Sequence, residues 1–242
     1  MLGKFFRNII IATILSISVN CFSQKQYEFD YLIEYELHQY KDTIKIKNRS
    51  FFEKDIKRKK YYLTNSKRNN YTAVITDLDS LHYQMSFKDQ EGILFNAKFL
   101  KSEFINTQYL SIDCQNITSY KNPFKYQTKN YAFSKLNDTV INGEPYGKYK
   151  LASNNMKKTK RMKLGTEFYV IDYKTSFHLP ILDFSTAYEE WKQDGKLPNG
   201  IFLEKYFVDY YGHLDSKEKL ISFKKVDKKI LIDSDCDYTV KN

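Results

Sequence analysis

Residues 27–38 read YEFDYLIEYELH, an alternation of apolar and polar side chains. Aromatic or aliphatic residues occupy every odd position from Tyr27 to Leu37, and the even positions are mostly acidic, with Leu32 as the exception. A β-strand places successive side chains on opposite faces, so this pattern gives one apolar face and one solvated face. The stretch therefore predicts a long β-strand that is buried on one side.

The same alternation continues along the chain. Residues 71–75, 81–87 and 93–99 form three consecutive stretches of this kind, joined by short polar turns, which is typical of an antiparallel meander. Further strands are predicted at 110–114, 131–136, 148–151, 167–173, 201–211, 220–223 and 230–232. Of these, 201–211 is apolar at both alternating sets of positions, which indicates a strand covered on both faces.

Only residues 185–193 have a helical pattern, with Ser185 as the expected N-cap and Gly195 just after the C-terminus. No linker rich in Pro or Ser divides the chain. The predicted fold class is all-β: an antiparallel, strongly curved meander sheet or open half-barrel with one short helix. Residues 24–242 are expected to form a single domain.

Composition excludes several classes of activity. The 242 residues include only eight glycines, and neither of the glycine-rich phosphate-binding motifs nor the G-x-S-x-G nucleophile motif occurs. His213 and Asp215 are spaced as an acid–base pair could be, but a plain loop after Gly212 explains them as well. We therefore expect no catalytic residues, no metal and no cofactor, and a protein that is not an enzyme. A hydrolase whose active site assembles only in space is the less favoured alternative.

The first 23 residues predict a secretory signal peptide. Lys4 and Arg7 precede an apolar run at 9–19, which is too short to span a bilayer, and cleavage is expected before Gln24. A short membrane anchor and a lipoprotein modified at Cys21 are the alternatives; Asn20 fits a lipoprotein processing site badly. The expected location is outside the cytoplasm: periplasmic, associated with the outer membrane, or secreted.

Two cysteines, Cys114 and Cys236, remain in the mature chain. An oxidising compartment would allow them to form a disulfide. The polar surroundings of Cys236 slightly favour two separate thiols, so the sequence leaves the pairing open.

The chain is basic, with 39 Lys and Arg against 29 Asp and Glu, and two clusters at 54–60 and 157–163 stand out. The second cluster consists of Lys157, Lys158, Lys160, Arg161 and Lys163. Both are expected in or beside turns. An exported protein rarely meets nucleic acid, so the predicted contact is the phosphate of an anionic membrane surface. The alternative is that these lysines only keep the protein soluble.

Aromatic residues make up 17% of the chain, more than a small sheet needs to form its core. We therefore predict that the concave face of the sheet binds a lipid-like ligand or a protein partner, with Tyr31, Tyr83 and Phe95 lining the site. Trp191, on the predicted helix, would cover the cavity or simply plug one end of the sheet. A structural envelope protein with a solid core is the competing interpretation. The sequence does not indicate an oligomeric state.

A short motif late in the chain, LPNGI at 197–201, resembles the motif of the GLPGLI family of exported bacterial envelope proteins. Residues 141–152 are similar to the strand pair that precedes this motif in the family, and HLPI at 178–181 is similar to its Ile-Pro step. The motif is degraded, because Lys196 replaces the first glycine and Asn199 is an additional residue. The resemblance implies an envelope protein with a curved half-barrel fold like that of lipid or lipoprotein carriers, and it implies no activity.

Overall fold

The computed structural model describes residues 24–40, 44–46, 49–51 and 56–239. The predicted signal peptide at 1–23, with Cys21, lies outside the described residues, as do Lys54 and Asp55 of the first basic cluster. Within the described residues, no helix is both long and apolar enough to cross a membrane.

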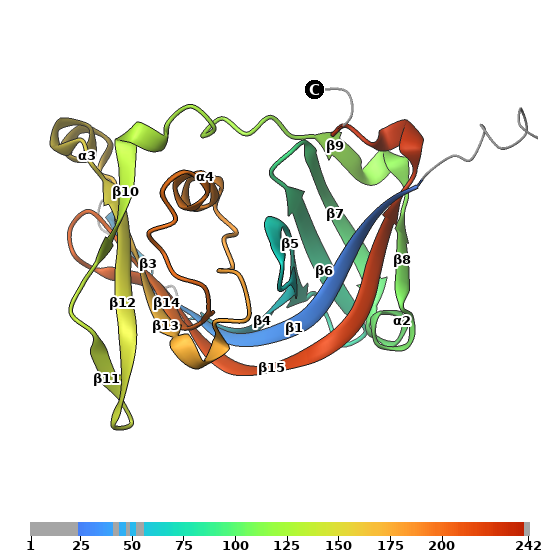
Figure 1. Ribbon diagram of the computed structural model, residues 1–242, viewed down its shortest axis with the longest axis horizontal. Helices are drawn as coiled ribbons and strands as arrows, with labels where there is room; N and C mark the ends of the chain where they lie inside the picture. Colours follow the sequence, from blue (N-terminus) through green and yellow to red (C-terminus); the bar gives the residue numbers. More distant parts are fainter. Residues whose placement is uncertain (1–23, 41–43, 47–48, 52–55, 240–242) are drawn as a thin grey trace, which may run out of the picture.

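One large sheet of 13 strands organises the molecule (Figure 1). From one edge to the other it contains β10 (Tyr131–Lys135), β12 (Glu144–Ser153), β13 (Thr166–Asp172), β14 (Ile201–Val208), β15 (Leu214–Ile232), β1 (Lys25–Gln39), β4 (Ile56–Asn65), β5 (Arg68–Asp77), β6 (His82–Asp89), β7 (Ile93–Leu100) and β9 (Ile117–Ser119). In addition, β11 (Thr139–Ile141) pairs with β12 and β8 (Tyr109–Ile112) pairs with β15, while β2 (Ile44–Ile46) and β3 (Arg49–Phe51) form a separate hairpin. The strands are antiparallel except at β8, and the sheet is strongly curved and open, so the predicted fold class is confirmed.

Two long strands, β1 and β15, form the centre of the sheet. They pair from Lys25 with Ile232 to Gln39 with Ser216, with two register shifts along the way. The sequence predicted separate strands at 220–223 and 230–232, because the lysine-rich residues between them lack apolar alternation. That prediction was wrong, since pairing with the neighbouring backbone of β1 holds this polar stretch in an extended conformation.

The structure contains three α-helices among its described residues, where the sequence predicted one. Besides α4 (Ser185–Asp194) there are α2 (Lys101–Asn106) and α3 (Met156–Met162), each only about two turns long. Helices this short carry too little periodicity to be recognised in a sequence. The expected N-cap is displaced by one residue, because Phe184 is the N-cap of α4 and Ser185 is its first helical residue. The Ser185 hydroxyl lies 2.5 Å from the Tyr120 hydroxyl.

The core is divided into two parts. The first core contains Tyr27 and Phe29 of β1, together with buried residues of β4–β9 and the end of β15, including Phe87 and Phe95. The second core contains Tyr31, Ile33 and Tyr35, the next apolar residues of β1, together with residues of β12–β14 and α4. The prediction that β1 and the meander present one continuous inward surface was therefore wrong: β1 contributes to two cores, and Leu81 is 65% exposed.

The chain itself covers the hollow of the curved sheet. Figure 1 shows α4 and the segment before it inside the curve, above the centre of β1 and β15. Ile181, Leu182, Ala187, Tyr188 and Leu197 from this part of the chain are buried in the second core. Gly200 of the LPNGI stretch has a positive φ of 144° and lies so close to β13 that a Cβ would come within 2.6 Å of Ile171. Only glycine fits that position without displacing the strand.

A disulfide joins Cys114 to Cys236, with the two Cα atoms 5.5 Å apart. The slight preference of the sequence for separate thiols was therefore wrong. The parallel pairing of Ile112 with Ile232 brings the two following segments side by side, and Cys236 is buried in the first core although its neighbours in sequence are polar. The bond closes a loop across 122 residues and ties the end of the chain to the meander half of the molecule.

Candidate functional site

The centre of the concave side holds a buried ionic cluster rather than an open cavity. Its members come from β4, β14, β15 and the segment before α4, and we call it the Tyr62 cluster: Lys60, Tyr62, Asp183, Lys205 and Glu218. The Tyr62 hydroxyl lies 3.0 Å from Asp183 Oδ2 and 2.8 Å from Glu218 Oε2. Two amines surround these carboxylates, and both are mostly buried.

Lys205 Nζ is 2.9 Å from Asp183 Oδ1 and 3.5 Å from Glu218 Oε1. Lys60 Nζ is 2.7 Å from the same Glu218 oxygen and 3.4 Å from Asp183 Oδ2. Burial alone would lower the pKa of Lys205, but Asp183 and Glu218 outweigh it and the pKa lies above its usual range. Burial would likewise raise the pKa of Asp183, and Lys205 and Lys60 hold it below its usual range instead. The cluster is therefore charged, paired and sealed by its own neighbours.

Glu167 on β13 lies next to this cluster and is 8% exposed. Its Oε2 accepts a hydrogen bond of 2.7 Å from the Tyr169 hydroxyl. Burial raises the pKa of Glu167 to about 7, although the charge of Lys205 acts in the opposite direction.

A Glu167→Gln variant is expected to change how stability depends on pH. Because the folded-state pKa is raised from 4.5 to about 7, the folded protein holds this proton between those values and the unfolded chain does not. The wild-type protein should therefore lose roughly 2–3 kcal/mol of stability relative to the variant as the pH rises from about 4.5 to 7.5. Urea unfolding of both proteins at several pH values measures this difference. A difference that stays constant over the range would contradict it.

Beside the Tyr62 cluster a small hollow of about 210 Å³ opens, lined by Thr72, Val74, Ser86, Lys88, Gln90, Leu182 and Asp183. Lys88 Nζ donates to the backbone oxygen of Asp183 at 3.3 Å. This space is below the usual size of a ligand pocket. The concave face is thus filled by the chain's own residues.

A larger groove, of about 380 Å³, lies beside α2, and we call it the α2 groove. Strands β1, β4, β5, β6 and β15 and helix α2 supply its walls: Leu32, Glu34, Tyr61, Ile75, Tyr83, Phe104, Ile105, Ser222, Lys224, Val226 and Lys228. Leu32, Tyr61, Tyr83 and Val226 also pack against the first core, so the apolar floor of the groove continues into it. Strand alternation explains the β1 side of the wall, because Leu32 and Glu34 are the even-numbered residues that point away from the second core.

The charges of the α2 groove are predominantly positive. Lys228 Nζ donates to the backbone oxygens of Phe104, at 2.6 Å, and of Thr107, so it binds the C-terminal end of α2. Burial and the nearby Lys224 lower the pKa of Lys228. Glu34 is engaged by Lys59 at 2.8 Å, and among the described residues no carboxylate lies within ion-pair distance of Lys224 or Lys228. An apolar floor with two amines that lack a countercharge suits a ligand with an apolar chain and an acidic group.

The four residues predicted to line a ligand site do not meet. Tyr83 lines the α2 groove, with its ring 5.6 Å from that of Phe104. Phe95 is 1% exposed and belongs to the first core, while Tyr31 lies at the edge of the second core, 5.5 Å from the Phe177 ring. Trp191 donates from Nε1 to the backbone oxygen of Leu197 at 3.1 Å, which fastens α4 to the LPNGI stretch. Only Tyr83 borders the candidate site.

Sequence reasoning missed Phe104, Ile105, Lys224 and Lys228 as site residues. The first two belong to α2, which is too short to be predicted, and the two lysines lie in the polar middle of β15, where no strand was expected. The available signal was the apolar pair Phe104 and Ile105 just after a predicted strand, which is compatible with a short amphipathic segment.

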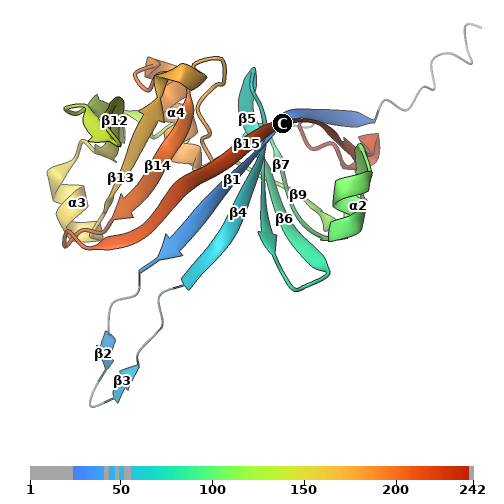
Figure 2. The ribbon, with the colours of Figure 1, turned by 90° about the horizontal axis from the view of Figure 1, so that it is seen from below.

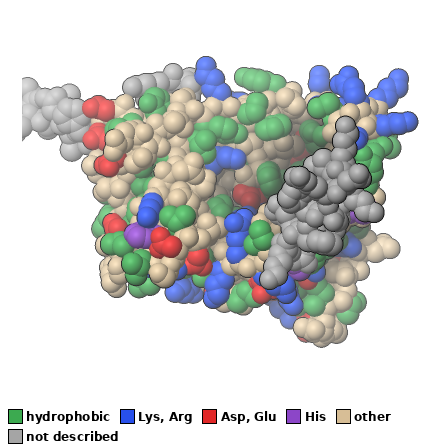
Figure 3. All heavy atoms as spheres, turned by 180° about the vertical axis from the view of Figure 1, so that it is seen from behind, with side chains coloured by type: hydrophobic (Ala, Val, Ile, Leu, Met, Phe, Trp, Pro, Cys, Tyr) green, Lys and Arg blue, Asp and Glu red, His purple; other side chains and the backbone are tan. Residues whose placement is uncertain are grey.

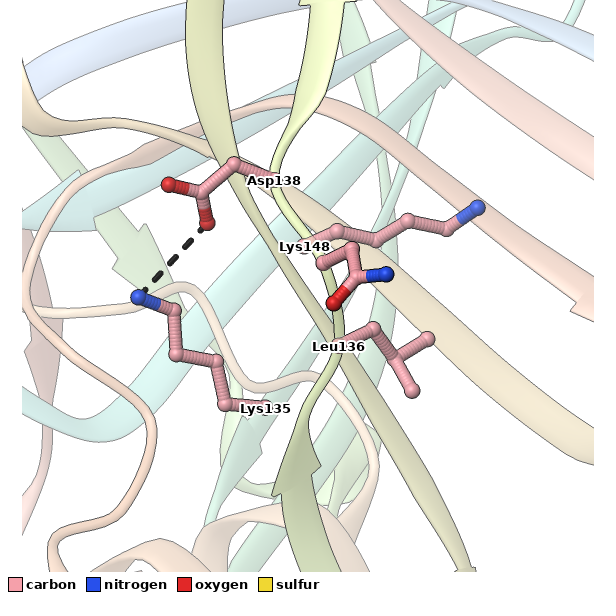
Figure 4. A pocket seen from close by; sticks show the side chains of 5 residues that line it. Lys135, Leu136, Asp138 and Lys148 are labelled. Atoms are coloured by element: carbon pink, nitrogen blue, oxygen red, sulfur yellow. Dashed lines mark ion pairs between the residues drawn. The ribbon is translucent and has the colours of Figure 1, made fainter.

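A wide hollow, of about 820 Å³, lies along the connection between β10 and β11 (Figure 4). Lys135, Leu136, Asn137, Asp138 and Lys148 line it, and Lys135 pairs with Asp138 at 3.6 Å. In Figure 4 the Lys148 side chain extends away from this ion pair, so the charged groups do not converge on one point. We do not consider this open hollow a binding site.

The histidines of the described residues are used in local contacts. His178 is buried, and its Nε2 lies 2.9 Å from Thr64 Oγ1. His213 Nδ1 lies 3.4 Å from Asp209 Oδ2, whereas the sequence had left open a pairing with Asp215 or a plain loop. The described residues contain no group of three or more His, Cys, Asp or Glu side chains arranged to hold a metal ion.

The two basic clusters differ in their surroundings. Lys157, Lys158, Lys160 and Arg161 belong to α3, and Lys163 lies in the turn that follows it, where the sequence predicted a cluster in or beside a turn. Figure 3 shows Lys and Arg side chains gathered at the corner of the molecule where Figure 1 places α3. In the described part of the other cluster, 56–60 on β4, Lys59 pairs with Glu34 of β1, whereas Lys60 pairs with Glu218 in the Tyr62 cluster. Glu34 and Glu36 of β1 line a shallow hollow together with Lys57, Arg58 and Lys59.

No protein-family model matches the chain, so the likeness to GLPGLI proteins stays a resemblance. No curated protein matches it either. Among solved structures, the complex of MucA and MucB from Pseudomonas aeruginosa is similar over 82% of this chain and 52% of that chain, with 7% identity and a TM-score of 0.39. MucB in a second structure is similar over 83% and 54%, with 6% identity and a TM-score of 0.37.

A domain named for outer membrane lipoprotein sorting, from Vibrio parahaemolyticus, is similar over 81% of this chain and 85% of that chain. Its identity is 8% and its TM-score 0.31. The chain spans about half the length of the MucB chains that it matches. These scores are too low to assign the chain to a fold family or a function.

Proposed function

We propose that this protein is an exported β-protein of the cell envelope that binds an anionic amphiphile, such as a fatty acid, in the α2 groove. Export is supported by the signal-peptide pattern of residues 1–23 and by the Cys114–Cys236 disulfide, a bond that persists in oxidising compartments. Both observations concern location, and binding rests on the groove.

One observation carries the binding proposal: the α2 groove combines an apolar floor with amines that no carboxylate of the described residues pairs. Its volume of about 380 Å³ falls in the range of small-molecule pockets. Each methylene that moves from water into contact with Leu32, Tyr83 and Phe104 contributes about 0.8 kcal/mol. Lys224 then offers its charge to an acidic headgroup, and Lys228 is already half buried at the groove wall.

Exposed apolar side chains next to α2 extend the same surface into solvent. Leu81, Leu100 and Ile105 are 65%, 46% and 68% exposed, and the backbone N–H of Lys101 donates to the carbonyl oxygen of Leu81. Exposed apolar side chains that gather in one place indicate contact with a ligand, a partner or a membrane. They support a ligand with a hydrocarbon chain.

Titration of the full chain with a fluorescent fatty acid tests the proposal. We expect saturable binding, and about tenfold weaker binding by a Lys224→Glu variant, because repulsion replaces a charge-assisted contact. Lys225→Glu is the matched control: this exposed neighbour on the same strand alternates to the opposite face and should bind like the wild type. The uncharged methyl ester of the probe should bind more weakly than the acid.

Three results would contradict the proposal: no saturable binding, equal effects of Lys224→Glu and Lys225→Glu, or equal affinity for acid and ester. In the first case the second candidate function would remain, a structural envelope protein with a solid core. One observation favours it, namely that α4 and the Tyr62 cluster fill the concave face.

A further inference from the structure

Helix α3 (Met156–Met162) has no fully buried residue, and Met156, Lys157, Lys160, Arg161 and Met162 are exposed, while Lys158 and Thr159 are partly covered. Both ends are nevertheless fixed. The backbone N–H of Lys158 donates to Asn155 Oδ1 at 2.9 Å, Lys163 adopts a left-handed conformation with φ of 50°, and the N–H of Leu164 donates to the Thr159 carbonyl oxygen at 3.1 Å. A helix of seven residues is not stable through its own hydrogen bonds, so these end contacts hold it in place as an exposed platform.

The platform is strongly cationic. Residues 156–163 read MKKTKRMK and contain five cations and no acid. Among the described residues, no carboxylate lies within ion-pair distance of any of the five. The basic residues of β4 differ in this respect, since Lys59 pairs with Glu34. An unbalanced positive charge on one small surface attracts a polyanion.

Apolar side chains stand among these cations. Met156 is 77% exposed and Met162 57% exposed, one at each end of α3. Tyr211, which is 61% exposed, lies beside Lys163, whose Nζ is 5.3 Å from its ring centre. Thioether and aromatic groups between amines match the boundary of a bilayer, where phosphates lie directly above hydrocarbon. The backbone of a nucleic acid or an acidic protein surface offers no such apolar layer.

We infer that α3, with Tyr211, is a docking surface for an anionic phospholipid bilayer, in which the cations contact the lipid phosphates and Met156 and Met162 enter the interface. Charge complementarity and the exposed methionines carry this inference, which does not depend on the α2 groove. Figure 2 shows α3 and α2 at opposite ends of the molecule, so a bilayer docked at α3 would lie at the other end from α2.

Co-sedimentation of the full chain with vesicles tests the inference, using phosphatidylglycerol mixed with phosphatidylcholine and, separately, pure phosphatidylcholine. The wild type should bind the anionic vesicles, less so at high salt, and should bind the neutral vesicles poorly. The triple variant K157Q/K160Q/R161Q should bind about 100-fold more weakly, at roughly fivefold per cation. Lys98→Gln, Lys121→Gln and Lys125→Gln together are the matched control, because they remove the same charge from exposed positions elsewhere and should have little effect.

A second variant, M156S/M162S, keeps every charge and should bind the anionic vesicles several-fold more weakly, because it removes the apolar contacts. A short DNA duplex serves as the non-membrane polyanion. The inference would be overturned if the two triple variants lost binding equally, if neutral and anionic vesicles bound alike, or if the methionine variant bound like the wild type. Binding of the duplex as tight as that of the vesicles, with the methionine variant unaffected, would assign the surface to nucleic acid instead.

Discussion

Replacing Lys205 with Met should destabilise the protein by about 3–5 kcal/mol, because it leaves buried carboxylates without their countercharge. The Lys205 side chain is 6% exposed and lies 2.9 Å from Asp183 and 3.5 Å from Glu218. Without it, two acidic groups and the neighbouring Glu167 face one another at the centre of the concave side, with Lys60 as the remaining amine of the cluster. Urea unfolding at pH 7 measures the loss.

Two comparisons make the Lys205 result specific. Lys217→Met removes an amine that is 31% exposed and pairs with Glu204 at 2.8 Å, and the cost should stay below about 1 kcal/mol. Adding Asp183→Asn to the Lys205→Met variant should recover part of the lost stability, because it removes one of the unpaired charges. Equal losses for the two lysines would show that the Tyr62 cluster contributes no more than a surface ion pair.

Replacing Phe95 with Ala should cost about 3–5 kcal/mol, the usual cost of emptying a phenylalanine site in a packed core. The Phe95 side chain is 1% exposed, and its ring stacks on that of Phe87 with 4.7 Å between the centres. The ring does not line the α2 groove, so its removal creates a cavity inside the first core and not a larger binding site. Thermal or urea unfolding measures the effect.

Tyr126→Ala is the control for Phe95, since this aromatic residue is 84% exposed and its loss should change stability by about 0.5 kcal/mol or less. Phe95→Leu keeps most of the apolar volume and should cost clearly less than Phe95→Ala. Two results together would contradict the packing described for the first core: a Phe95→Ala variant with nearly unchanged stability, and a higher affinity of that variant for the fatty-acid probe. They would show that Phe95 lines the ligand site, as the sequence predicted.

Local alternation explains why much of the fold could be predicted. The residues of β1 alternate between buried odd positions and more exposed even positions, as the YEFDYLIEYELH stretch predicts. The meander of β5, β6 and β7 follows for the same reason, because each strand pairs with its neighbour in sequence through a short turn. Strand identity and short hairpins depend on contacts within a few residues, and such contacts leave a periodic trace in the chain.

The candidate site could not be predicted in the same way. Residues 201–211 indicated a strand covered on both faces, and β14 does carry buried residues. The position of Lys205 beside the other members of the Tyr62 cluster, however, depends on four segments that are distant in sequence. The α2 groove likewise depends on how α2 packs against β6 and β15, and Tyr83 is the one residue of the predicted site that borders it. Side-chain periodicity reports which face of a strand is apolar, and not what packs against that face.

The amino-acid order was sufficient to establish an all-β chain, a curved antiparallel sheet and the apolar face of each clear strand, because these properties follow from side chains that alternate along one backbone. Long-range packing established the rest: the division of the core into two parts, the filling of the concave face by α4, the Cys114–Cys236 bond and the apolar, cationic α2 groove. Each of these features brings together residues from separate strands or loops. The free energy of contact between those residues is gained only when the whole sheet has formed.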